Sequence, residues 1–181
     1  MKTIILAGGC FWGVEAYYAR LKGVLDTAVG YTDAPAENPS YQDVCRGSGH
    51  AEVCRVTYDE AVLPLQKVLE HFFRIVDPTQ KDEQGHDRGV QYRNGIYYVD
   101  SNDRLDIEAY VASVRTKYKK PVHTFVKPAT PFYEAEGYHQ DYLDKNPGGY
   151  CHVDMSLLRP DEIKPERRTF LLDPRAGKGG H

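Results

Sequence analysis

The order of the predicted secondary-structure elements constrains the fold of this chain more than any other feature. Apolar runs with strand or helix spacing follow one another as strand, helix, strand, strand, helix and strand. In chain order they cover residues 3–7, about 12–21, 24–31, 52–58, a helical run that begins at Glu60, and 96–99. This order predicts an α+β fold of the ferredoxin-like split βαβ type, a two-layer sandwich with additional loops.

Further segments surround this predicted core. They are a polar loop at 32–50, a second polar loop at 77–95, a helix at about 103–118, a short strand at 123–126 and a helical stretch at about 138–145. Loops of such length in a compact domain are usually functional. We expect one domain over residues 1–158, followed by a C-terminal tail, residues 159–181, that is extended or weakly ordered coil.

The composition excludes several classes of protein. With 41% hydrophobic and 27% charged residues, the chain resembles an ordinary soluble globular domain. A formal net charge of −3, with scattered Lys and Arg residues, argues against nucleic-acid binding. No apolar run is long enough for a membrane span, and the apolar start of the chain ends at Gly8, too early for a signal peptide. We therefore expect a cytoplasmic protein, monomeric by default.

One cysteine lies where the first predicted strand ends and the first helix begins, in the run Gly8-Gly9-Cys10-Phe11-Trp12. Unpaired N–H groups and the positive end of the helix dipole should lower the pKa of a thiol at this position. The glycines let a substrate approach the backbone, and Phe11 and Trp12 offer an apolar wall. Although a free cysteine is more often a small buried hydrophobe, this context favours Cys10 as a nucleophile.

Glu52 is the second informative residue. It shares the more apolar side of its strand with Cys54, Val56 and Tyr58. A carboxyl group on the core side is desolvated, so its pKa rises and it becomes a candidate general acid near neutral pH. The alternative is a glutamate at the strand end that turns to solvent. His50 either pairs with Glu52 or is a loop histidine, and we favour the loop.

Six short motifs, in order, resemble those of the A-type peptide methionine sulfoxide reductases. They are Gly9-Cys10-Phe11-Trp12-Gly13, Asn38-Pro39-Ser40-Tyr41, Gly49-His50-Ala51-Glu52, Asp77-Pro78-Thr79, Asp87-Arg88-Gly89-Val90-Gln91-Tyr92-Arg93 and Tyr138-His139-Gln140-Asp141-Tyr142. The resemblance extends from residue 9 to about residue 151 and so covers most of the chain. Each motif alone is weak, whereas six in family order are specific.

The resemblance implies a reaction and its catalytic residues. Cys10, as thiolate, would attack the sulfur of a methionine S-sulfoxide, free or in a protein. Glu52 would donate a proton to the sulfoxide oxygen, assisted by the hydroxyls of Tyr41 and Tyr92. Methionine would leave, and Cys10 would remain as a sulfenic acid. The resemblance implies no cofactor and no metal, and an oxidative-damage repair function.

The resemblance also implies substrate-binding and recycling residues. Phe11 and Trp12 would hold the substrate methyl group, and Asp87 would contact the substrate backbone nitrogen or order the pocket. Cys151 would condense with the sulfenic acid of Cys10, and thioredoxin would reduce the resulting disulfide. The alternative for Cys151 is a buried residue in a turn.

The two remaining cysteines are expected to take no part in the reaction. Cys54 is predicted to be a packed core thiol, and Cys45 resembles a position of the family that often carries a non-catalytic cysteine. A metal site formed by Cys45, His50 and Cys54 would have only three ligands and lacks a C-x2-C pair, so we do not favour it.

Other functional classes remain as alternatives. A metal-carrying ferredoxin-like module also uses a thiol in its first loop, but generally two closely spaced cysteines, whereas Cys10 is alone. A thiol peroxidase would not need Glu52 as an acid. A cysteine hydrolase needs a histidine base, and His50, His86 and His139 lack a recognisable signature.

Overall fold

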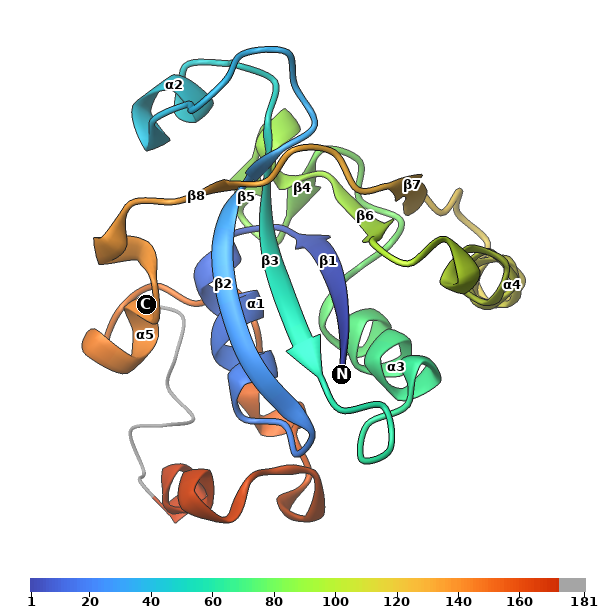
Figure 1. The fold of residues 1–181 in the computed structure, drawn as a ribbon, viewed down its shortest axis with the longest axis vertical. Helices are drawn as coiled ribbons and strands as arrows, with labels where there is room; N and C mark the ends of the chain where they lie inside the picture. Colours follow the sequence, from blue (N-terminus) through green and yellow to red (C-terminus); the bar gives the residue numbers. More distant parts are fainter. Residues whose placement is uncertain (173–181) are drawn as a thin grey trace.

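The computed structural model of the chain describes residues 1–172, and these contain a six-stranded sheet with helices packed against it (Figure 1). The strand order is β7-β6-β1-β3-β2-β8. The strands are β1 (Lys2–Gly8), β2 (Val24–Thr32), β3 (Ala51–Tyr58), β6 (Asn94–Tyr98), β7 (Phe125–Pro128) and β8 (Tyr133–Glu134). All neighbouring strands are antiparallel except β6 and β7, which are parallel. The predicted α+β class is confirmed.

The longer helices cover one face of this sheet. They are α1 (Phe11–Ala19), α3 (Leu65–Ile75) and α4 (Arg104–Arg115). Because side chains alternate along a strand, Ile4 and Leu6 of β1 pack into one core cluster with residues of these helices. Ile5 of β1 points to the other face, where Phe125 and Phe132 pack beside it. The segment that carries these two phenylalanines connects the two outermost strands (Figure 1).

The first long loop is more ordered than the sequence predicted. It contains the short helix α2 (Tyr41–Cys45). Ser40 is the N-cap of α2, because its hydroxyl accepts a hydrogen bond from the Asp43 backbone N–H and the Asp43 carboxylate accepts one from the Ser40 N–H. A serine followed three residues later by an acidic residue is a recognisable sign of a helix start, and the prediction of an irregular loop did not take it into account.

The second long loop is a small hairpin. It contains β4 (Glu83–Gln84) and β5 (Asp87–Arg88), which pair with each other and not with the main sheet. The remaining elements are 3-10 helices at Val90–Tyr92, Ser101–Asp103, Gly137–His139, Met155–Leu157, Pro160–Glu162 and Pro165–Leu172.

Two helix boundaries differ from prediction. Helix α3 begins at Leu65 and not at Glu60, because the extended Pro64 is its N-cap. The predicted helix at 138–145 is broken, and only α5 (Tyr142–Lys145) is an α-helix. The break lies at Asp141, whose φ of +53° is left-handed and cannot continue a right-handed helix.

The described part of the C-terminal segment packs against α1 and α3. The Ile163 side chain is fully buried, and Leu21 forms a β-bridge with Ile163. The Glu162 carboxylate accepts two hydrogen bonds from the Arg74 guanidinium, at 2.7 and 3.1 Å. The division between a domain at 1–158 and a tail remains a prediction, and residues 173–181 lie outside the described residues.

Within residues 1–172, every helix is too short or too polar to cross a bilayer.

The packing of Ile163 generates a stability prediction. Ile163→Ala removes a side chain with no solvent exposure and leaves a cavity, so we expect the free energy of unfolding to fall by about 2–4 kcal/mol. Val62→Ala is the control, because Val62 is 57% exposed and its truncation should change the stability by less than about 0.5 kcal/mol. Urea unfolding of both variants measures the difference, and equal stabilities would contradict the docking of this segment.

Candidate active site

Cys10 lies at the junction of β1 and α1 and is the N-cap of the helix. The preceding Gly9 has φ +87°, and a Cβ built on it would lie 2.7 Å from Gln84 Cβ, so only glycine fits there. Burial raises the pKa of the Cys10 thiol well above its ordinary value, and Glu52 raises it further, although a hydrogen bond from the Trp12 backbone lowers it. The predicted lowering of this pKa is therefore wrong, because desolvation outweighs the helix N-terminus.

Glu52 is buried beside the start of the same helix. One oxygen, Oε1, accepts a hydrogen bond from the Phe11 backbone N–H at 3.3 Å. The other, Oε2, is buried and has no partner within residues 1–172. Burial raises the pKa of Glu52 to about 8, in spite of the hydrogen bond from Phe11, and the charge of Asp87 raises it as well. The predicted placement of Glu52 on the apolar side of β3 is confirmed.

Two tyrosines share the electrostatic environment of Cys10 and Glu52. Burial raises the pKa of Tyr41 and of Tyr92, and in both cases the charge of Glu52 is the next cause and Cys10 also contributes. Both hydroxyls therefore keep their protons at neutral pH and are hydrogen-bond donors. Neither is bonded to Glu52 in the described part of the chain, so the carboxyl oxygen Oε2 is left open.

The two aromatic residues after Cys10 have different surroundings. Phe11 is almost fully buried, with its ring 5.6 Å from that of Tyr31 and 5.2 Å from that of His139. Trp12 is only partly buried, and its ring is stacked on Tyr142 at 3.8 Å between centroids. The indole Nε1–H donates to His139 Nδ1 at 3.0 Å, which fixes the orientation of the indole.

Asp87 and the segment of Cys151 reach the site from two other parts of the chain. The Tyr150 hydroxyl donates to Asp87 Oδ2 at 2.8 Å. The neighbouring Cys151 thiol is buried and donates to the Val153 carbonyl at 3.3 Å. All four cysteines of the chain are free thiols in this structure, and Cys151 contributes to the electrostatic environment of Cys10.

Two acidic residues that the sequence did not single out hold the parts of the site together. Glu136 accepts hydrogen bonds from the Tyr31 hydroxyl and from the Tyr41 backbone N–H, both at 2.9 Å, and so fixes the start of α2. Glu15, buried on α1, accepts from the Asp141 backbone N–H at 2.7 Å and stabilises the left-handed residue before α5.

The sequence could have indicated one of these two residues but not the other. Glu15 was detectable, because it is a carboxyl in a helix with apolar residues on all sides, and burial raises its pKa to about 7. Glu136 gave no local signal, since its partners are about a hundred residues away in the chain.

The two remaining cysteines and His50 have different surroundings, and Cys45 interacts with the Tyr41 hydroxyl. Cys54 is fully buried in the core cluster, as predicted, and Cys45 is exposed at the end of α2. His50 is a buried loop histidine, as favoured, and its ring nitrogens pair with Ser48 Oγ and the Ala36 carbonyl. Among the residues that the structure describes, no cluster of three or more His, Cys, Asp or Glu side chains could hold a metal ion.

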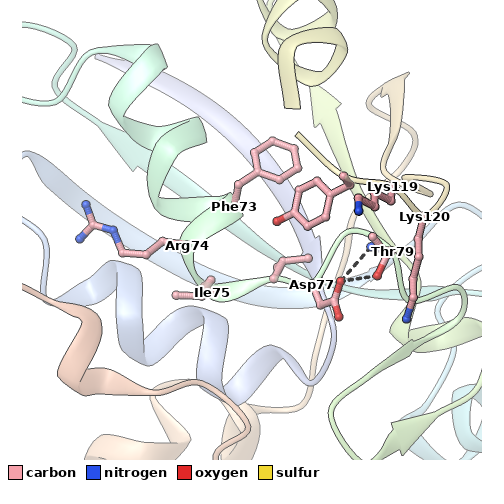
Figure 2. A pocket seen from close by; sticks show the side chains of 9 residues that line it. Phe73, Arg74, Ile75, Asp77, Thr79, Lys119 and Lys120 are labelled. Carbon is pink, nitrogen blue, oxygen red and sulfur yellow. Dashed lines mark hydrogen bonds between the residues drawn. The ribbon is translucent and has the colours of Figure 1, made fainter. Parts of the chain in front are cut away.

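A surface cavity of about 530 Å³ lies elsewhere, between the end of α3 and the residues that follow α4 (Figure 2). Its lining includes Phe73, Tyr118 and Lys120, and the Asp77 carboxylate accepts from Thr79 there. Neither Cys10 nor Glu52 lines this cavity, and its lining contains no thiol. The chemistry therefore points to the junction at Cys10 and not to this cavity.

Comparison with known proteins decides the family. The family model described as peptide methionine sulfoxide reductase matches residues 2–169. The chain belongs to this family. It is 53% identical over 156 residues to the peptide methionine sulfoxide reductase MsrA of Clostridium botulinum (strain Okra / Type B1), which covers 86% of this chain and 99% of the relative. With the MsrA of Clostridium acetobutylicum the identity is 52% over 160 residues, 88% of this chain and 99% of the relative.

Solved structures agree with the sequence comparison. Reduced Mxr1 from Saccharomyces cerevisiae has a TM-score of 0.76 and 38% identity, covering 83% of this chain and 88% of Mxr1. Methionine sulfoxide reductase A of Corynebacterium diphtheriae has a TM-score of 0.72 and 34% identity, covering 83% and 77%. This member of the family is therefore an oxidoreductase that reduces methionine sulfoxide.

The raised pKa of Glu52 generates a prediction about stability and pH. A carboxyl group that binds its proton more tightly in the folded state stabilises the fold below its ordinary pKa of 4.5, and this contribution is lost as the pH rises through about 8. We expect Glu52→Gln, which cannot ionise, to lack this decline in the free energy of unfolding. Urea unfolding across this pH range measures it.

A matched control separates Glu52 from the other buried carboxyl group. Because the pKa of Glu15 is about 7, Glu15→Gln should remove only the part of the decline that ends near that pH. Parallel pH profiles for the unmodified protein and Glu52→Gln would show that Glu52 is ionised in the folded state.

Proposed function

We propose that Cys10 is the nucleophile and Glu52 the acid in the reduction of methionine S-sulfoxide, free or in proteins, to methionine. The observation that carries this proposal is that a thiol and a buried, unpartnered carboxyl oxygen meet at one helix N-terminus. The backbone N–H of Phe11, which directly follows Cys10, donates to Glu52 Oε1 and leaves Oε2 for another partner. Enzymes of this kind reduce one sulfoxide epimer each, and the S epimer follows from the family.

The raised pKa of Glu52 supports its role as an acid. With a pKa of about 8, the carboxyl group is mostly protonated at neutral pH and can donate to the sulfoxide oxygen. Proton transfer makes the sulfur a better electrophile for Cys10. The sulfoxide and the Cys10 thiol are converted to methionine and a Cys10 sulfenic acid, so the oxygen moves from substrate sulfur to enzyme sulfur. Because the pKa of Cys10 is also raised, thiolate formation should occur together with substrate activation and not before it.

The surrounding residues complete the proposed site. The protonated hydroxyls of Tyr41 and Tyr92 would donate to the sulfoxide oxygen beside Glu52, as in an oxyanion hole. Trp12, held by stacking and a hydrogen bond, would hold the substrate methyl group together with the more deeply buried Phe11. Asp87 would bind the substrate backbone nitrogen or order the pocket, and its bond to Tyr150 supports the ordering role.

Recycling would use the second thiol at the site. Cys151 would attack the Cys10 sulfenic acid, form a disulfide and release water. A disulfide-reducing protein must then return both thiols. The solved complex of Mxr1 with Trx2, at a TM-score of 0.54 and 27% identity over 78% of this chain and 84% of that chain, supports thioredoxin in this role.

Three further proposals concern the fold type, the extent of the domain and the location in the cell. We propose that the sheet core is ferredoxin-like, because β6-β1-β3-β2 is an antiparallel sheet and α1 and α3 cover one of its faces. We propose that the catalytic domain extends over residues 1–158. A cytoplasmic location is supported by the four free thiols, which are typical of a reducing compartment.

The function is tested by a direct assay. The reduced protein is incubated with a mixture of methionine sulfoxide epimers and dithiothreitol, and methionine is measured by chromatography. We expect the S epimer to be consumed, and Cys10→Ser to form no methionine, because serine cannot accept the oxygen. Cys54→Ala is the control cysteine variant, since Cys54 is buried away from the reaction. Methionine formation by Cys10→Ser would overturn the proposal.

Replacement of the second thiol should separate the two halves of the cycle. Cys151→Ser retains the nucleophile and the acid, so we expect about one methionine per enzyme and then a stop when thioredoxin is the reductant. Rapid quench, followed by chromatography, measures both phases. Normal turnover of Cys151→Ser with thioredoxin would exclude Cys151 as the resolving thiol.

A further inference from the structure

We infer that Gly13 is a positioning residue for disulfide formation. Because Gly13 has no side chain, the Cys151 segment, residues 151–153, packs directly against α1. This inference rests on the proposed role of Cys151 as the resolving thiol. It concerns only the second half of the cycle and assigns Gly13 no contact with the substrate.

The surroundings of Gly13 carry the inference. A Cβ built on Gly13 would lie 3.0 Å from Val153 Cγ2, 3.2 Å from His152 Nδ1 and 3.3 Å from Cys151 Sγ. All three separations are shorter than an ordinary carbon contact of about 3.5–4.0 Å. Three consecutive residues of a segment about 140 positions away therefore rest on one glycine. Any other residue at this position would push the segment outward.

The helix itself does not require a glycine at this position. Gly13 lies inside α1 and is absent from the residues of positive φ that the structure describes, so an alanine would fit the backbone. A glycine within a helix makes the fold less stable than an alanine would. The close approach of Cys151 and its neighbours is the feature of the structure that accounts for the glycine.

His152 holds the segment in this position against α1. Its Nε2–H donates to the Gly8 carbonyl at the end of β1, at 2.9 Å. Burial lowers the pKa of His152, so the ring is neutral and its proton is on Nε2. The other nitrogen, Nδ1, is buried against Gly13 and finds no partner within the described part of the chain. The segment is thus fixed to the same strand end that leads into Cys10.

Tyr150 fixes the other side of Cys151 through its bond to Asp87. Contacts on both sides hold the resolving thiol beside the start of α1 before the reaction begins. Condensation of the Cys10 sulfenic acid with the Cys151 thiol forms the S–S bond and releases water, and its rate depends on how often the two sulfur atoms meet. Contacts that restrict the motion of the Cys151 segment raise the frequency of these encounters.

The test is Gly13→Ala. We expect methionine formation in the first turnover to stay within about twofold of the unmodified rate, and formation of the Cys10–Cys151 disulfide to slow roughly tenfold or more. Rapid quench with alkylation and mass spectrometry follows methionine and the disulfide in the same sample. Gly137→Ala is the matched control, because a Cβ on Gly137 meets no atom of the described residues within 4 Å.

A second change distinguishes displacement of the Cys151 segment from a general disturbance of α1. Val153 Cγ2 is the nearest of the three atoms, so Val153→Ala should make room for the new methyl group. We expect the double variant Gly13→Ala with Val153→Ala to recover disulfide formation relative to Gly13→Ala alone. A helix damaged by the alanine would show no such recovery.

A third variant covers the case in which Gly13→Ala does not fold. His152→Ala adds no volume but removes the bond to the Gly8 carbonyl, and it should slow disulfide formation in the same way, whereas His152→Gln keeps a donor and should restore it. The inference is overturned if disulfide formation is unchanged in Gly13→Ala, or in His152→Ala where the first variant is unfolded. The proposed function fails separately, if Cys151→Ser recycles normally with thioredoxin.

Discussion

The hydrogen bond from the Phe11 backbone to Glu52 is the contact on which the site depends. It joins the first turn of α1 to β3, so that Phe11, the residue next to Cys10, and a carboxyl group 41 positions further along the chain are in direct contact. A helix N-terminus offers N–H donors without partners, and here one of them orients the Glu52 carboxyl group. The positions of the proposed nucleophile and the proposed acid are thereby set by the main fold and not by a flexible loop.

Burial then determines the protonation of the whole site. It raises the pKa of Cys10, of Glu52 and of the two tyrosines in the same direction, towards the protonated form. A site in this state is poor at binding a cation but has several protons to offer to an oxygen atom. That property suits a substrate whose oxygen must accept a proton before it can leave carbon-bound sulfur. Desolvation thus prepares the acid, at the expense of the thiolate.

The parts of the molecule that follow local rules were predictable from sequence. The four central strands and α1 are apolar runs bounded by turn residues, and the placement of Glu52 followed from the alternation of side chains along β3. The break at Asp141 was not predictable, because a buried carboxyl group of α1, Glu15, stabilises it from 126 positions away. The pKa of Cys10 was misjudged for a related reason, since the depth of burial depends on segments that arrive from the far end of the chain.

The arrangement around Trp12 has a consequence for how this protein can be observed. Trp12 is the only tryptophan of the 181 residues, and its indole is stacked on Tyr142 and bonded to His139. The tryptophan emission of the whole protein therefore originates at the proposed active site, from a ring whose neighbours belong to the segment that Glu15 and Glu136 anchor. Emission intensity and wavelength thus report the state of that segment directly, without an attached dye.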